Sequence, residues 1–244
     1  MALAPRRRTI SMGAATAGRE GIDEGLRRYM LRVYNYMSLG LALTGVVAFT
    51  VANTPAVLQF FYTQTGPTML AYIAMFSPLV FVLAISFGIR KLSTPTVQVL
   101  FWAFAGAMGL SLTHIFLIYT GTSIARVFFI TASVFAAMSL YGYTTKRDLT
   151  GIGSFLFMGL IGIVIASIVN IFLQSSMMQF IISVVGVLVF VGLTAYDTQN
   201  IKNEYDASDS GDVAEKKSIH GALRLYLDFI NLFIMMLHLF GNRE

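Results

Sequence analysis

The sequence predicts an all-α membrane protein, a bundle of seven transmembrane helices, and two observations support this prediction. Hydrophobic residues make up 56% of the 244 residues, and charged residues make up only 12%, about half the share found in soluble domains. The apolar residues also gather in runs close to the roughly 20 residues that a helix needs to cross about 30 Å of hydrocarbon. We therefore expect lipid to surround most of the chain.

Seven apolar segments have this length. They are Val33 to Ala52, Thr68 to Gly88, Thr96 to Tyr119, Ile124 to Tyr143, Gly151 to Leu173, Met177 to Tyr196 and Leu223 to Phe240. The last segment is the shortest and the most polar, so six spans followed by a re-entrant or half-buried helix is an alternative. The segments lack the period-two alternation of a membrane β-barrel, and strands are not expected.

Positive charge is concentrated before the first apolar segment. Seven of the 17 basic residues lie there: Arg6, Arg7, Arg8, Arg19, Arg27, Arg28 and Arg32. The later connections alternate between basic or mixed and uncharged, which by the positive-inside rule places the N-terminus in the cytoplasm. The basic charge thus reflects topology, and no nucleic-acid partner is expected. The absence of cysteine excludes disulfides and thiolate metal sites.

Two regions are predicted: a mobile cytoplasmic tail over residues 1–32 and a single seven-helix domain over residues 33–244. The one sizeable hydrophilic insertion, Gln199 to Gly221, is interpreted as a cytoplasmic loop. Its stretch from Asp206 to Lys217 only superficially resembles a calcium-binding loop, because a lysine replaces the final bidentate glutamate.

Asp197 and Asp228 are the acidic residues that lie in or beside the apolar segments. An ionisable group inside a membrane costs several kcal/mol unless it is paired, neutralised or hydrated, so it predicts a functional site. Asp197 precedes Lys202 on a helix that enters the cytoplasm, and Asp228 follows Arg224 on the helix that leaves it. Both carboxyls should lie roughly 6 to 8 Å inside the cytoplasmic boundary, where they can meet and share one proton.

Helical spacing predicts a polar stripe on the last helix. Its members, which follow steps of three and four, are Arg224, Asp228, Asn231, Met235 and His238. A weaker stripe that includes Thr194 and Asp197 lies on the preceding helix. Residues at this spacing share one helix face, and a polar face belongs against the protein interior or a watery cavity. Arg224, Asn231, Thr194 and His238 are therefore candidate supporting residues.

The acid pair has two interpretations. It can act as a pH-controlled gate that contacts a cation transiently, or it can be a hydrogen-bonded link, with Arg224 or Asn231 as partner, that fastens the last helix to the bundle. Protonation would compete with a hard cation such as Ca²⁺ for the carboxylate oxygens. His114 is interpreted as a packing residue, and Arg126 as a side chain that extends to the outer interface.

No enzyme and no cofactor are predicted. Tyr196-Asp197 fits the first half of the intramembrane aspartyl protease motif, but Leu225-Tyr226-Leu227 precedes Asp228 where that motif requires Gly-x-Gly. The three histidines lack the spacing of zinc ligands.

Five stretches of the sequence resemble the transmembrane Bax inhibitor motif (Bax inhibitor-1) family, in its bacterial type. They are Met108-Gly-Leu-Ser-Leu, Ile115-Phe-Leu-Ile-Tyr-Thr, Phe135 to Leu149, Ala195-Tyr-Asp-Thr-Gln199 and Leu225-Tyr-Leu-Asp-Phe-Ile-Asn-Leu-Phe233. The similarity runs from about Arg27 to Gly241.

This resemblance implies a seven-helix bundle with a central last helix, and a proton-sensitive calcium leak controlled by the aspartates matching Asp197 and Asp228. Ca²⁺ would be the permeant ion and the bacterial inner membrane the location. It also implies an alternative, a non-conducting regulator that binds a membrane protease or a stress or cell-death partner. The second span lacks the acidic residue expected in some channel-like members, a departure that bears on conduction.

Overall fold

A computed structural model describes residues 12–63 and 66–242, with side chains described from Glu24 onward. The chain there is almost entirely helical. Its elements are α1 (Met12–Ala52), α2 (Pro55–Phe61), β1 (Tyr62–Thr63), β2 (Gly66–Pro67), α3 (Met69–Gly88), α4 (Thr94–Leu112), α5 (Ile115–Ile118), α6 (Gly121–Thr144), α7 (Thr150–Leu173), α8 (Ser176–Asn203) and α9 (Gly211–Phe240). The two short strands pair antiparallel in the connection between the first two spans.

Seven helices within the described ranges are long and apolar enough to cross a membrane, which confirms the predicted fold class. The prediction of a short last helix was wrong. α9 has 30 residues, and of the seven candidate spans it has the largest buried share. The sequence pattern showed only its apolar part, because its first turns are hydrophilic. By length and composition α9 is a candidate span like the other six.

The predicted loop between Gln199 and Gly221 was also too long. α8 continues to Asn203 and α9 begins at Gly211, so only residues 204–210 connect them. Helices can continue into water when polar residues replace apolar ones, and hydropathy alone then places their ends too early.

At the other end of the chain, α1 begins at Met12. The part of the predicted tail from Met12 to Arg32 is therefore helical, and residues 1–11 lie outside the described residues. The mobility of this segment stays a prediction.

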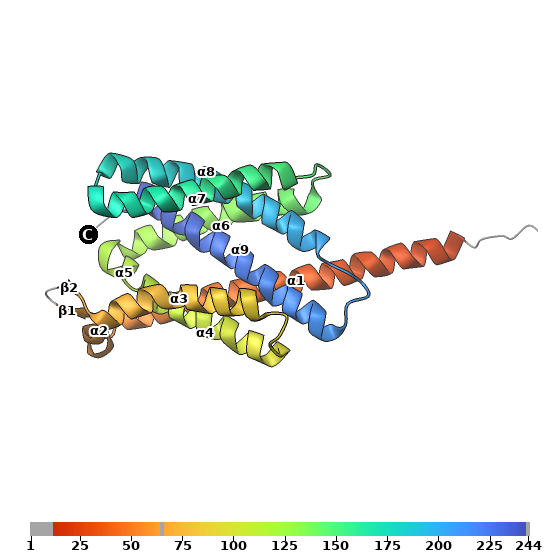
Figure 1. The fold of residues 1–244 in the computed structure, drawn as a ribbon, viewed down its shortest axis with the longest axis horizontal. Helices are drawn as coiled ribbons and strands as arrows, with labels where there is room; N and C mark the ends of the chain where they lie inside the picture. Colours follow the sequence, from red (N-terminus) through yellow and green to blue (C-terminus); the bar gives the residue numbers. More distant parts are fainter. Residues whose placement is uncertain (1–11, 64–65, 243–244) are drawn as a thin grey trace, which may run out of the picture.

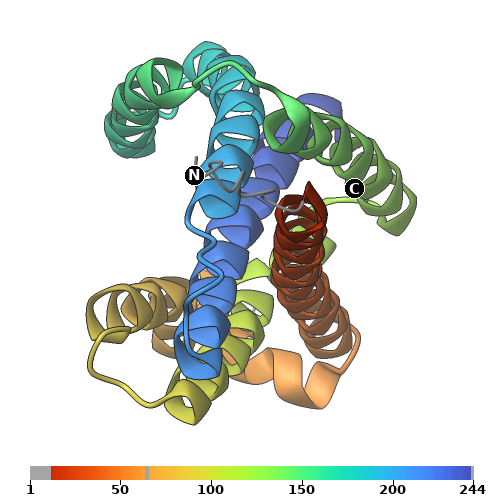
Figure 2. The ribbon, with the colours of Figure 1, turned by 90° about the vertical axis from the view of Figure 1, so that its right-hand side faces the viewer.

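α9 lies in the middle of the bundle, as Figure 1 shows. It packs against α8, α1, α6 and α4. In the view along the bundle (Figure 2), α7 lies outside α8, and α3 lies beside α4 on another side. α1 packs against α4 and α9, and α6 packs against α8 and α9. The group with α1 and α4 is therefore joined to the group with α6 and α8 largely through α9.

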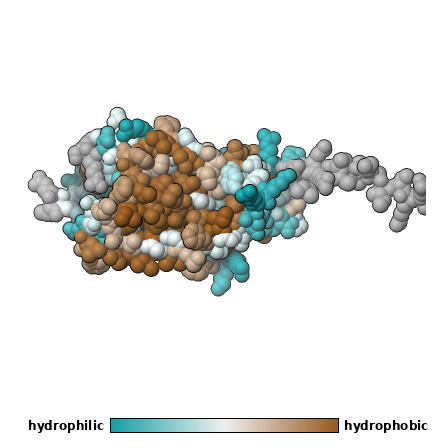
Figure 3. Space-filling view, turned by 90° about the horizontal axis from the view of Figure 1, so that it is seen from above, coloured by the Kyte–Doolittle hydropathy of each residue, from teal (hydrophilic) through white to brown (hydrophobic). Residues whose placement is uncertain are grey.

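The outer face of the bundle is apolar. In Figure 3 hydrophobic side chains form a broad belt, with hydrophilic residues near both ends. Large exposed side chains such as Phe87 and Phe172 belong to it, on α3 and α7. In water such a surface would drive aggregation, whereas in a bilayer it is the surface that acyl chains solvate.

Gly142 brings α6 close to α8 beside the acid pair, because a Cβ at this position would overlap the carbonyl oxygen of Ala195. We expect Gly142→Ala to lower the free energy of unfolding by about 1–3 kcal/mol through overpacking, measured by SDS-induced unfolding in mixed micelles. Gly162→Ala is the control, since a Cβ there meets nothing within 4 Å. Equal midpoints for the two variants would contradict this assignment.

The start of α7 depends on Asp148, whose Oδ1 accepts hydrogen bonds from the Thr150 amide and hydroxyl at 2.9 and 2.6 Å. These bonds favour the carboxylate and lower the pKa of Asp148. Their contribution to stability is thus present above the usual carboxyl pKa and is lost as the pH falls through the lowered value. Asp148→Ala should reduce the melting temperature at pH 7, and this difference from wild type should shrink as the pH falls through the lowered pKa of Asp148. Lys146→Ala, in the same loop, should show no such difference.

Candidate functional site

The candidate site lies where α8 and α9 pack together near their cytoplasmic ends. Because residues 204–210 reverse the chain directly, the two helices are antiparallel neighbours, and Asp197 and Asp228 reach the same depth. The two carboxyl groups lie near enough to each other to interact. Asp228 is only 6% exposed. The two acids therefore lie near each other, while their role in pH sensing stays a prediction.

Arg224 connects this pair to a third acid. Its Nη2 donates to Asp197 Oδ1 at 2.6 Å, and its Nη1 donates to Glu204 Oε1 at 2.7 Å. The Arg224 and Asp197 side chains are only 22% and 15% exposed. Charge-assisted bonds of this kind, shielded from water, are among the stronger polar contacts in proteins. One guanidinium therefore holds two carboxylates from the end of α8.

The Asp228 carboxyl has no cation of its own in this arrangement. Its Oδ2 is buried and makes no hydrogen bond within the described residues. A buried carboxylate without partners is costly, whereas a protonated carboxyl can donate to a neighbouring carboxylate. This geometry is thus suited to hold one proton between Asp228 and Asp197, with Arg224 balancing the remaining charge.

The polar stripe of α9 faces α8 along its whole length. Besides the Asp228 contact, Met235 lies against Gly186, and His238 Nδ1 is 3.1 Å from the Gln179 amide nitrogen. The apolar side of α9 is the more deeply buried one. It packs against the other helices through Tyr226 on Phe104 and through Phe229 on Phe128 and Phe135.

Of the four predicted supporting residues, the structure brings only Arg224 to the pair. The Asn231 amide donates to the Leu227 carbonyl, and the Thr194 hydroxyl donates to the Phe190 carbonyl, each within its own helix. His238 lies near the outer end of α9, where Gln179 connects it to Asn170 and Ser183. Residues on one helix face thus need not belong to one site, because the face extends over several turns of the helix.

The remaining candidates lie on the outer side. His114 Nδ1 is 2.8 Å from the Ser111 carbonyl oxygen, and the ring lines a cavity of about 210 Å³ together with His238. Arg126 donates to the Phe240 carbonyl at 3.3 Å. A cation there interacts favourably with the C-terminal end of α9.

Two parts of the site were missed in the sequence. Glu204 was assigned to a loop, although it follows Asp197 by two helical turns and so shares its face. The second part is a hydroxyl chain beside the pair, in which Ser139 Oγ lies 2.6 Å from Tyr34 Oη and 2.9 Å from Thr198 Oγ1. No spacing in the sequence indicates these contacts between three helices.

The site is not a high-affinity metal cage. Within the described residues there is no group of three or more His, Cys, Asp or Glu side chains that could hold a metal ion. Hard cations such as Ca²⁺ usually take six to eight oxygen ligands. The transient cation contact expected at Asp197 and Asp228 stays a prediction.

Fold and site together define a class: a seven-span helical membrane protein with a buried pair of acids between its last two helices. The particular family follows from comparison with known sequences. The family profile described as "Inhibitor of apoptosis-promoting Bax1" matches residues 26–244. The chain belongs to this family, as its motifs indicated.

Bacterial relatives match over nearly their whole length. An uncharacterized protein RP147 of Rickettsia prowazekii is 52% identical over 229 residues, 94% of this chain and 95% of the relative. The inner membrane protein YbhL of Escherichia coli K12 is 50% identical over 222 residues, 90% and 94% of the two chains. An uncharacterized membrane protein, SpyM3_0260, of Streptococcus pyogenes is 37% identical over 222 residues, 91% and 96% of the two chains.

Removing Arg224 should test how strongly it joins the two helices. We expect Arg224→Met to cost about 3–5 kcal/mol of unfolding free energy, because Asp197 would be left without its cation. When Asp197→Asn is combined with Arg224→Met, part of that loss should be recovered. A double-mutant cycle measures this coupling free energy between the two residues. Arg28→Met, which removes an exposed pair with Glu24, is the control and should have little effect. Additive effects of Arg224→Met and Asp197→Asn would contradict the coupling.

Proposed function

We propose that this protein is a pH-sensitive cation leak, with Ca²⁺ as a permeant ion, in which Asp197 and Asp228 form a proton-sharing gate. The observation that carries the proposal is the buried Asp228 carboxyl near Asp197 inside the bundle, with Arg224 bonded to Asp197. Family membership and the multi-pass fold are compatible with transport, and the relative named an inner membrane protein suggests the same membrane here. We propose no enzymatic activity.

The closed state holds one proton on the pair. Asp228 then donates to Asp197, and the negative charge of Asp197 holds Arg224. A second proton neutralises Asp197, which removes both the acceptor of the Asp228 proton and the partner of Arg224. α9 is then released from α8 at its cytoplasmic end. The leak is therefore expected to rise as the pH falls.

Calcium flux into proteoliposomes across a pH series tests the gate. Asp197→Asn removes the charge that holds Arg224, so its leak should be high and nearly independent of pH. Asp228→Asn keeps a donor to Asp197 but leaves only one titrating acid, so its profile should shift relative to wild type. Asp148→Asn and Asp206→Asn, at exposed aspartates outside the spans, are matched controls and should retain the wild-type profile.

The gate assignment is wrong if the Asp197→Asn and Asp228→Asn variants leak with the wild-type pH profile. Wild-type flux no greater than that of empty liposomes would reject conduction altogether.

A non-conducting regulator is the second candidate. It is supported by the ion pair that already neutralises Asp197, because a satisfied carboxylate can serve as a structural link between α8 and α9. In that case the protein would bind a membrane protease or another integral partner. Flux equal to that of empty liposomes, together with co-purification of one defined membrane protein, would favour this function over the leak.

A further inference from the structure

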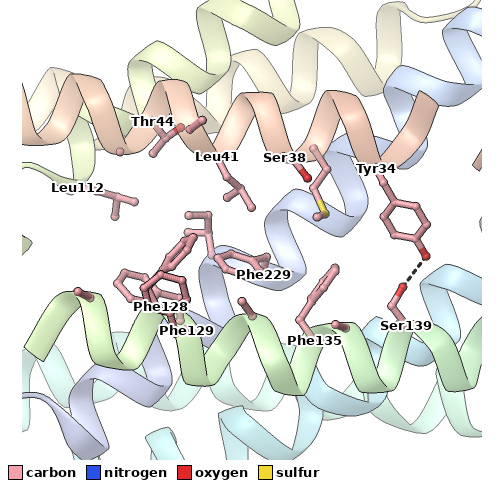
Figure 4. A pocket seen from close by; sticks show the side chains of 18 of the residues that line it. Tyr34, Ser38, Leu41, Thr44, Leu112, Phe128, Phe129, Phe135, Ser139 and Phe229 are labelled. Carbon is pink, nitrogen blue, oxygen red and sulfur yellow. Dashed lines mark hydrogen bonds between the residues drawn. The ribbon is translucent and has the colours of Figure 1, made fainter. Parts of the chain in front are cut away.

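A large open cavity lies on the side of α9 away from the acid pair. Its volume is about 1310 Å³, and it separates α1 from α6, with α9 between them as its floor (Figure 4). We call it the α1–α6 groove. Its wall is almost wholly apolar and includes Leu41, Phe49, Phe128, Phe135, Phe229 and Phe233.

The α1–α6 groove extends through most of the membrane. From Arg27 to Phe49 its α1 wall covers roughly 33 Å at 1.5 Å per residue, close to the roughly 30 Å of a hydrocarbon core. Side chains along both walls, such as Val46 and Leu140, are more than 60% exposed. Since α1 and α6 both span the membrane, the groove opens toward lipid.

The size and the polarity of the groove exclude a small metabolite. Pockets for such ligands measure about 300–1,000 Å³ and place several polar groups around the ligand. This groove is larger and offers only scattered hydroxyls, among them Ser38 and Thr44.

A hydrogen bond across the groove interrupts the path that a helix of another protein would take along its whole length. Tyr34 on α1 and Ser139 on α6 join their hydroxyls at 2.6 Å, as the dashed line in Figure 4 shows. A helix with its side chains is about 10 Å wide and cannot lie along a groove whose walls meet at this point. A flexible acyl chain is thin enough to pass beside the two hydroxyls.

The cytoplasmic end of the groove is basic. Arg27 lines it, and within the described residues this side chain makes no ion pair. Lys202 Nζ lies 5.1 Å from the ring centroid of Tyr143, another lining residue, and donates to its carbonyl at 2.7 Å. Glu24 is paired with Arg28 instead. An apolar groove with cations at its cytoplasmic end complements a lipid that carries negative charge on its headgroup.

We propose that the α1–α6 groove binds a diacyl phospholipid with an anionic headgroup, drawn from the cytoplasmic leaflet. Its phosphate lies at Arg27, and an acyl chain fills the apolar part beyond Tyr34 and Ser139. The inference does not rest on the proposed gate.

Native mass spectrometry of the full-length protein tests the proposal. The protein is released from detergent in the presence of phosphatidylglycerol or of phosphatidylcholine with the same acyl chains. Wild type should retain phosphatidylglycerol in preference to phosphatidylcholine. Arg27→Gln should reduce retention of phosphatidylglycerol about fivefold, the effect of one basic residue near an anionic membrane surface. Arg28→Gln is the matched control and should reduce it much less.

A second pair of variants tests the groove itself. Gly45 lines it and has nothing within 4 Å of a Cβ, so Gly45→Trp should block the acyl chain without disturbing the fold. Gly162→Trp, on the outer face of α7 and equally free of neighbours, is the control. Ala136→Trp should block the groove from the α6 wall. It provides a second measurement of phosphatidylglycerol retention if Gly45→Trp unfolds.

Several outcomes would overturn the proposal. Equal retention of both lipids by wild type would reject the anionic headgroup. Retention of phosphatidylglycerol by Gly45→Trp or Ala136→Trp at the level of Gly162→Trp would reject the groove as its site. A mass of two chains that disappears in Gly45→Trp would show that a second copy covers the groove instead.

Discussion

The ion pair of Arg224 with Asp197 and Glu204 is the interaction on which the arrangement of the last two helices depends. Charged groups placed among membrane helices are tolerated only when another charge, a proton or water compensates them. Here the three groups come from α8 and α9, and the short connection over residues 204–210 brings them together. Separation of these helices near the cytoplasm would break the bonds between the guanidinium and its carboxylates.

The central position of α9 follows from its two different faces. Its apolar side is covered by aromatic and aliphatic side chains of α1, α4 and α6, with Tyr226 between Phe104 and the Thr44 hydroxyl. Its polar stripe turns to α8, the helix that supplies acceptors and small residues. A helix that is polar on one side and apolar on the other cannot face acyl chains with its polar side, and burial in the bundle satisfies both sides.

The two proposed sites use opposite sides of this helix. The acid pair lies on the side toward α8, and Phe229 and Phe233 form the floor of the α1–α6 groove on the side toward α1 and α6. α1 and α6 therefore meet mainly through α9 and through the hydroxyls of Tyr34 and Ser139. Proton binding and lipid binding would thus act on opposite sides of the same central helix, and the Tyr34 and Ser139 hydroxyls lie next to both sites.

Much of the fold could be predicted from the sequence, because hydropathy and length report directly on a helix that must cross hydrocarbon. The seven spans and the common depth of Asp197 and Asp228 came from such local patterns. The patterns failed where helices leave the lipid, so Glu204 and the start of α9 were assigned to a loop. Only the tertiary structure decided that Arg224 reaches Asp197, that Asn231 and Thr194 bond within their own helices, and that α1 and α6 leave a groove. The ion pair and the groove join or separate different helices, and the internal bonds of Asn231 and Thr194 depend on what the packed neighbours leave unoccupied, which no spacing along one helix contains.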